Sequence, residues 1–177
     1  MGSGKTAVGR QVARLLSKPF LDSDHEIELR TGADIALIFE REGEAGFRRR
    51  ERAAIEELTA RAGIVLATGG GAVLSEENRA HLKNRGWVVY LETSVGQQAE
   101  RAGRTSHRPL LAGTDARSRL EELATIREPL YRQIADFTIS TTRRKVGQVA
   151  AHIATAYRDG LLPESAANVE CTGPESG

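Results

Sequence analysis

The stretch Gly2-Ser3-Gly4-Lys5-Thr6, near the start of this 177-residue chain, decides the fold. It matches the second half of the phosphate-binding pattern G-x-x-x-x-G-K-[ST]. Glycines let backbone N–H groups turn inward around phosphate oxygens, and the helix predicted directly afterwards adds a favourable dipole. Lys5 is then expected to reach the β- and γ-phosphates of a nucleotide, and the Thr6 hydroxyl to ligate Mg²⁺. The alternative is a Gly-Ser segment that caps a helix, and the fragment alone leaves it open.

Composition narrows the class of protein. A length of 177 residues fits one compact domain, and a net charge of +1 gives no electrostatic footprint for nucleic acid or an anionic membrane. No stretch approaches the roughly 20 apolar residues of a membrane span. The single cysteine, Cys171, cannot form an internal disulfide. We therefore expect a cytoplasmic monomer with no nucleic-acid or membrane partner.

Apolar periodicity predicts strands that alternate with helices. Helices are expected over 5–17, 25–31, 34–41, 43–62, 76–84, 94–102, 117–135 and 146–159, and strands over 20–21, 64–67, 87–91 and 137–140. This order indicates an α/β protein with a parallel sheet and ligands at the carboxyl ends of its strands. Residues 103–116 are rich in Gly, Arg, Thr and Pro and are expected to form a mobile loop, and 161–177 a disordered tail.

Two carboxylates follow the first predicted strand, in Asp22-Ser23-Asp24. We expect both on the same side of an extended segment, where one would hold the water shell of Mg²⁺ and the other would orient or deprotonate an attacking hydroxyl. The alternative is a strand-to-helix cap, for which Asp and Ser are favoured anyway. For this short pattern alone, the cap is the better interpretation.

Arginines gather at the predicted start of the helix over 43–62. Arg48-Arg49-Arg50 would oppose the helix dipole there, and a substrate carboxylate held by a guanidinium would account for the placement. A solvated face with Arg48–Glu51 pairs explains it equally well. The run Gly69-Gly70-Gly71 exceeds what a turn requires, which favours close approach of a ligand to the backbone over a plain turn.

Further arginines suit a nucleotide site. Arg101, Arg104 and Arg108 lie in the loop over 103–116 or beside it, which would suit a lid that closes on phosphates. Arg144 follows the last strand, where it could stack on an adenine. For each of these arginines, a solvated surface charge is the alternative.

Taken in order, these motifs resemble those of the shikimate kinase family over about residues 1–158. The matching segments are Gly2–Thr6, Asp22-x-Asp24, Gly43-Glu44-x-x-Phe47-Arg48-x-x-Glu51, Gly69-Gly70-Gly71, Arg108-Pro109-Leu110-Leu111, Arg127-x-x-x-Tyr131, Ala135 and Arg144. The resemblance implies ATP- and Mg²⁺-dependent phosphorylation of the 3-hydroxyl of shikimate, a step of aromatic amino-acid synthesis. It also implies a P-loop kinase of the nucleoside-monophosphate-kinase type, with a five-stranded parallel sheet in the order 2-3-1-4-5.

The resemblance also implies roles for individual residues. Catalysis would fall to Lys5, Asp24 and Arg108, and metal binding to Thr6 and Asp22. The substrate-binding positions are Asp24, Phe47, Arg48, Gly69, Gly70, Gly71 and Arg127, with the two arginines on the substrate carboxylate. The nucleotide-binding positions are Gly2, Ser3, Gly4, Lys5, Thr6, Arg108 and Arg144.

One departure concerns the central strand. Family members carry an apolar strand and the first loop glycine before the point where this sequence begins, so we expect the first strand of the sheet to be missing here and the natural product to begin upstream. Two other functions stay open at this stage. One is a gluconate or nucleotide kinase of the same fold, and the other is a nucleotide-binding protein without enzymatic activity.

Overall fold

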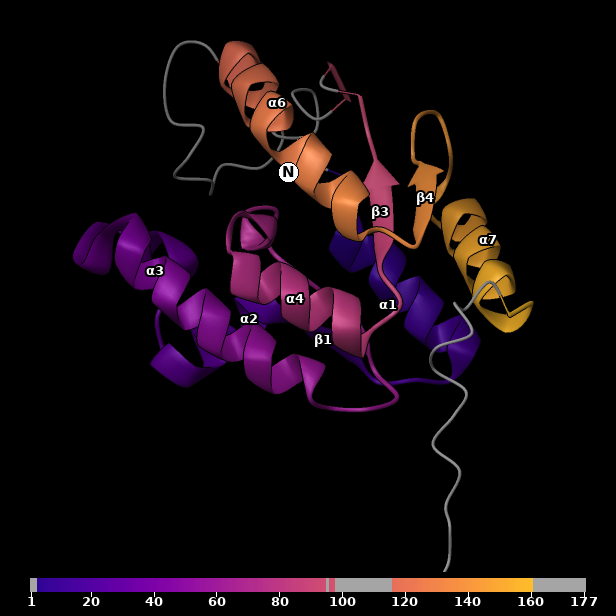
Figure 1. Cartoon of the computed structure of the whole chain (residues 1–177), viewed down its shortest axis with the longest axis horizontal. Coiled ribbons are helices and arrows are strands. Elements are labelled where there is room, and N and C mark those ends of the chain that lie inside the picture. The colour runs from indigo at the N-terminus through magenta and orange to yellow at the C-terminus, as the bar shows by residue number, and fades with distance from the viewer. Residues whose placement is uncertain (1–2, 95, 98–115, 161–177) are drawn as a thin grey trace, which may run out of the picture.

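The computed structural model describes residues 3–94, 96–97 and 116–160, in which strands and helices alternate (Figure 1). The helices are α1 (Lys5–Leu16), α2 (Ser23–Thr31), α3 (Ile35–Thr59), α4 (Glu76–Arg85), α6 (Ala116–Ile134) and α7 (Val146–Arg158), with a 3-10 turn η1 (Ala72–Leu74). The strands are β1 (Phe20–Asp22), β2 (Val65–Ala67), β3 (Val89–Glu92) and β4 (Phe137–Ser140). The predicted α/β alternation is therefore confirmed. The predicted tail, the lid before residue 116 and most of the helix predicted over 94–102 lie outside the described residues.

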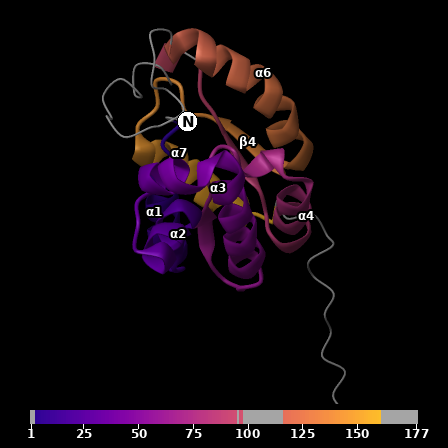
Figure 2. The ribbon, with the colours of Figure 1, turned by 90° about the vertical axis from the view of Figure 1, so that its left-hand side faces the viewer.

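Apolar side chains form two separate cores. One joins α1 and α7 to both pairs of strands through the buried residues Val8, Val12, Ile139, Val149, Ala150 and Ile153. The other joins α2 to α3 through Ile27, Ile38, Phe47 and Ala54. Figure 2 shows α6 running across one end of the molecule, above the remaining helices.

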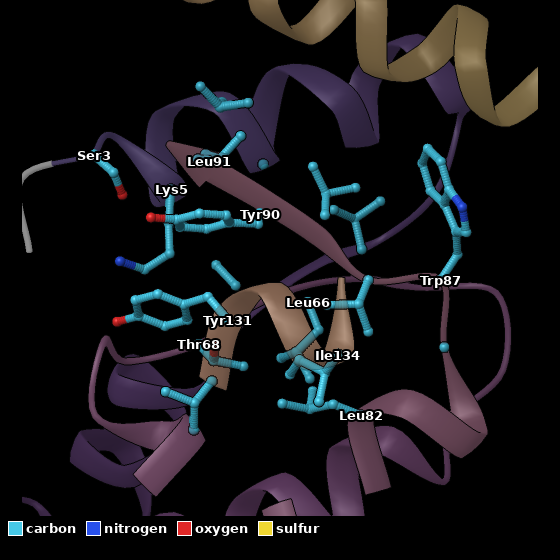
Figure 3. A pocket seen from close by; sticks show the side chains of 18 of the residues that line it. Ser3, Lys5, Leu66, Thr68, Leu82, Trp87, Tyr90, Leu91, Tyr131 and Ile134 are labelled. Atoms are coloured by element: carbon cyan, nitrogen blue, oxygen red, sulfur yellow. The ribbon is translucent and has the colours of Figure 1, made fainter. Parts of the chain in front are cut away.

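The strands of the described residues form two parallel pairs rather than one sheet. In one pair Leu21 lies opposite Leu66, and in the other Leu91 lies opposite Ile139. In the order 2-3-1-4-5 these are pairs 2-3 and 4-5, so the predicted arrangement without its central strand is confirmed. A cavity of about 1400 Å³, which we call the sheet gap, lies where β2 and β3 face each other, and α1 also lines it. Figure 3 shows Leu66 and Leu91 among the side chains that surround it.

The predicted start of α2 is wrong. Helix α2 begins at Ser23 rather than at residue 25, because the Asp22 carboxylate accepts a hydrogen bond from the Asp24 N–H (3.1 Å) and caps the helix. Asp24 therefore lies in the first helical turn, not in an extended segment.

The two helices predicted over 34–41 and 43–62 are confirmed as two helical segments of α3, separated by a kink at Gly43. Gly43 has φ of +67° and ψ of −178°, a non-helical conformation that glycine adopts at little cost. The three arginines at 48–50 lie in the second turn after this kink, near the start of the second segment.

Candidate active site

The predicted phosphate loop leads directly into α1. Gly4 has φ of +82°, a conformation that glycine adopts at little cost, and its carbonyl accepts the hydrogen bond from Val8 N–H (2.9 Å) that opens the helix. Lys5 is the first helical residue, and Figure 3 shows its side chain beside the Tyr90 and Tyr131 rings at the edge of the sheet gap. Ser3 is nearly buried, with 8% of its surface exposed. The loop thus turns where a phosphate site requires it, while Gly2 lies outside the described residues.

The two predicted metal ligands lie in contact. The Thr6 hydroxyl donates to Asp22 Oδ2 over 2.8 Å, while Asp22 Oδ1 caps α2. Both are hard oxygen donors of the kind that Mg²⁺ prefers, and Mg²⁺ is commonly held by one or two protein ligands together with waters and phosphates. In the described part of the chain, no group of three or more His, Cys, Asp or Glu side chains could hold a metal ion by itself. The pair therefore fits a Mg²⁺ ion that reaches the site with a nucleotide.

Asp24 combines burial with negative neighbours. Its Oδ1 atom is buried and has no hydrogen-bond partner among the described residues. Burial, and then the charges of Asp22 and Glu51, raise the pKa of Asp24 to about 6, against the opposing charge of Lys5. A carboxylate with a pKa near the working pH is well suited to accept a proton from a hydroxyl.

Arg48 is held by a buried acid. It donates to Glu51 Oε2 over 2.6 Å, and Glu51 is only 1% exposed. Burial disfavours the charged guanidinium, but Glu51 and Glu44 outweigh it and raise the pKa of Arg48. The guanidinium carbon also lies 5.3 Å from the centre of the Phe47 ring, which packs on Phe39 in the core between α2 and α3. Phe47 thus packs against the Arg48 guanidinium and links it to that core.

Arg127 is the second arginine of the site, and its side chain is buried. It is 5% exposed, and its Nε atom has no hydrogen-bond partner among the described residues. Burial, reinforced by the charge of Arg48, lowers the pKa of Arg127. A buried guanidinium with a donor to spare is costly unless an anion satisfies it, so this end of the site suits a carboxylate ligand.

Side chains packed against the glycine run leave no room for a Cβ atom at positions 69 and 71. A Cβ atom at position 69 would lie 2.9 Å from both Asp24 Oδ1 and Glu51 Oε1, and one at position 71 would lie 2.3 Å from two nitrogens of Arg48. The prediction that a ligand approaches the backbone of this segment stays a prediction. The groups that approach it are side chains of the site itself.

Three residues of the site had no predicted role. Glu51 lies in the motif from Gly43 to Glu51. Its spacing of three residues from Arg48 is the sequence feature that could have indicated the ion pair. Ser23 is fully buried and accepts a hydrogen bond from Gly69 N–H (3.3 Å). Tyr131 lies four residues after Arg127, on the same face of α6, and its hydroxyl contacts Gly70. No sequence pattern announces the Ser23 contact, because its partner lies 46 residues away.

One predicted nucleotide residue, Arg144, is not joined to this cluster in the described part of the chain. Arg144 is exposed in the turn after β4, and Arg108 lies outside the described residues. In the described residues, no helix has the length and apolar character to cross a membrane.

Comparisons with known proteins agree on one family. The family model described as shikimate kinase matches residues 1–158. A shikimate kinase of Thioalkalivibrio sulfidiphilus is 52% identical over 176 residues, which cover 98% of this chain and 93% of that protein. One of Pasteurella multocida is 57% identical over 154 residues, or 86% of this chain and 88% of that protein. The solved shikimate kinase of Acinetobacter baumannii in complex with shikimate is 50% identical, with a TM-score of 0.88 over 92% of this chain and 91% of that one.

Proposed function

This chain belongs to the shikimate kinase family, and from that premise we propose how its residues divide the work of phosphorylating shikimate. The chain is an enzyme that transfers a phosphoryl group from ATP to shikimate. Its place is in aromatic amino-acid biosynthesis. The proposed transfer is to the 3-hydroxyl, with Asp24, Arg48 and Arg127 as the central acceptor residues.

The observation that carries these roles is the placement of the buried Arg127 near the partly buried Arg48. Arg48 and Arg127 together would bind the substrate carboxylate, which supplies the anion that the buried Arg127 guanidinium requires. Fixing the carboxylate at one end of the ring orients a hydroxyl at the other. Asp24, whose pKa of about 6 leaves it ionised at neutral pH, would accept the hydrogen bond or the proton of that hydroxyl.

The phosphate end rests on α1. Ser3, Gly4 and Gly2 would supply backbone N–H groups to phosphate oxygens, and Lys5 would neutralise the charge that moves with the transferred group. Thr6 and Asp22 would hold Mg²⁺, which would supply positive charge to offset that of the phosphate groups.

Other assignments extend this proposal. Arg108 is proposed to close on ATP from a lid over about 103–116, and Arg144 to lie against the adenine. Residues 1–160 would form the catalytic domain and 161–177 a disordered tail. We further propose a cytoplasmic monomer, on the ground of the nearly neutral charge and single cysteine of the chain.

A coupled assay of ADP release tests the acceptor. Shikimate, gluconate and nucleoside monophosphates are offered in turn with ATP and Mg²⁺. We expect turnover with shikimate alone, because only a rigid ring with one carboxylate spans from the two arginines to Asp24. Turnover of gluconate without turnover of shikimate would overturn the proposal.

A further inference from the structure

The Tyr131 hydroxyl joins two elements of the site that are distant in the sequence. It donates a hydrogen bond of 2.5 Å to the carbonyl oxygen of Gly70, which lies 61 residues earlier. Arg127 lies one helical turn before Tyr131, and its positive charge acts on the same hydroxyl. The hydroxyl therefore contacts the glycine run and lies close to the buried arginine of α6.

The ring that carries this hydroxyl is held in place. It stacks on Tyr90 of β3 with 5.0 Å between ring centres and 22° between ring planes. Figure 3 shows both rings beside the Lys5 side chain at the edge of the sheet gap. Stacked aromatic pairs restrict ring movement, so the hydroxyl stays at a defined position relative to Gly70.

We propose that Tyr131 is a positioning residue for the binding of shikimate. The Tyr131 hydroxyl fixes the position of the Gly70 peptide relative to the Arg127 guanidinium. The peptide group is planar, so an anchored Gly70 carbonyl also sets the direction of the Gly71 N–H. A run of three glycines loses more conformational freedom on ordering than any other tripeptide, and it has no side chains with which to hold itself. The hydrogen bond from the Tyr131 hydroxyl restrains the Gly70 peptide.

The hydroxyl remains a donor throughout the neutral range. Burial raises the pKa of Tyr131 above its ordinary value, and the charge of Arg127 only partly opposes the rise. Tyr131 therefore keeps the proton that it donates to Gly70, and its role is to orient rather than to transfer protons.

The test compares two removals of a phenolic oxygen. Tyr131→Phe deletes the hydroxyl and keeps the stacked ring, while Tyr90→Phe deletes the hydroxyl of the other ring of the same pair. For Tyr131→Phe we expect the KM for shikimate to rise about 5- to 10-fold, the factor given by losing one hydrogen bond of ordinary net strength. The KM for ATP should stay within a factor of two. Tyr90→Phe should change neither value.

This inference rests on shikimate as the acceptor, so a second readout is independent of turnover. Hydrogen exchange of the ligand-free protein is measured for peptides spanning residues 66–74. Faster exchange in Tyr131→Phe, with Tyr90→Phe like the wild type, supports the positioning role even if the wild type fails to phosphorylate shikimate. That failure would refute only the proposed function. Unchanged exchange together with an unchanged KM in Tyr131→Phe, or equal effects in both variants, would overturn the role of Tyr131.

Discussion

The acceptor cluster, formed by Asp24, Arg48, Glu51 and the run Gly69–Gly71, differs sharply from the sheet gap. In the acceptor cluster, charged side chains are buried and contact each other closely, as the 2.6 Å bond between Arg48 and Glu51 shows. The sheet gap is instead a cavity of about 1400 Å³, whose lining includes apolar side chains of β2, β3 and α1 and reaches Gly69, Gly70 and Arg127. One region is held together by its own side chains, whereas in the other the described strands β2 and β3 do not pair with each other.

The contrast indicates that the two substrates depend on different parts of the fold. The acceptor cluster is built from β1, α2, α3 and the segment after β2, which pack on a core of their own. The phosphate loop depends on α1, which packs on both strand pairs and so on the sheet gap. We therefore expect changes in the acceptor cluster to affect shikimate specifically, and changes in the sheet gap to affect stability and ATP binding.

The largest effect is expected from Asp24→Asn. The amide cannot accept the proton of the substrate hydroxyl, so kcat should fall by about 100- to 10,000-fold, the range typical for a lost general base. The affinity for ATP, measured by equilibrium titration, should change little because α1 and its loop are untouched. An unchanged kcat would remove Asp24 from the role of base.

Arg48→Ala is expected to weaken shikimate specifically. Loss of charge-assisted hydrogen bonds to the carboxylate should raise the KM for shikimate roughly 10- to 100-fold. Arg50→Ala is the matched control, because Arg50 lies on the same helix but is exposed and paired with Glu42. Steady-state kinetics with each substrate varied would measure both. Equal effects of the two variants would show that Arg48 acts only through the stability of α3.

An added strand tests the sheet gap. A chain extended before residue 1 by an apolar segment of high β propensity should fill the gap and pair with β2 and β3, raising the thermal midpoint by roughly 10 °C if it adds a few kcal/mol. A Gly-Ser extension of equal length is the control. Calorimetry gives the midpoint, and ATP titration shows whether the phosphate loop is tightened as well. Equal midpoints for the two extensions would mean that the gap does not accept a strand.

The smallest effect concerns pH. Asp24 must be ionised to act as a base, so kcat/KM for shikimate should fall as pH drops through about 6, the raised pKa of this carboxyl. Glu51→Gln removes a negative charge that raises the pKa of Asp24, so the acid limb should move to lower pH by less than about one unit. A pH profile of both proteins measures the shift. A limb that moves to higher pH would contradict the electrostatic account.

Much of the site was predictable, for reasons that differ between residues. Arg48 and Glu51 are three residues apart on a helix, and a local spacing of this kind places both side chains on one face. Thr6 and Asp22 were both predicted as metal ligands, and the structure brings the two side chains into contact. The cap by Asp22 was an open alternative, and the structure shows that Asp22 caps α2 and contacts Thr6 at once. The break at Gly43 was predicted, because the sequence places the end of one helix and the start of the next around this glycine, and the non-helical φ and ψ of Gly43 within α3 bear this out.

The sequence by itself determined the family, the strand and helix order and the identity of the charged groups, because motifs and periodicity are local properties of the chain. Only the tertiary structure decided how deeply those groups are buried and which charged or polar groups lie beside them. Burial raises the pKa of Asp24. The fold places the buried Glu51 against Arg48 and brings Tyr131 to Gly70, which lies 61 residues earlier in the chain. Tertiary structure also separated the strands into two pairs around the sheet gap. These features depend on distances between segments far apart in the chain, and the free energy of burying or pairing a charge is set by such distances.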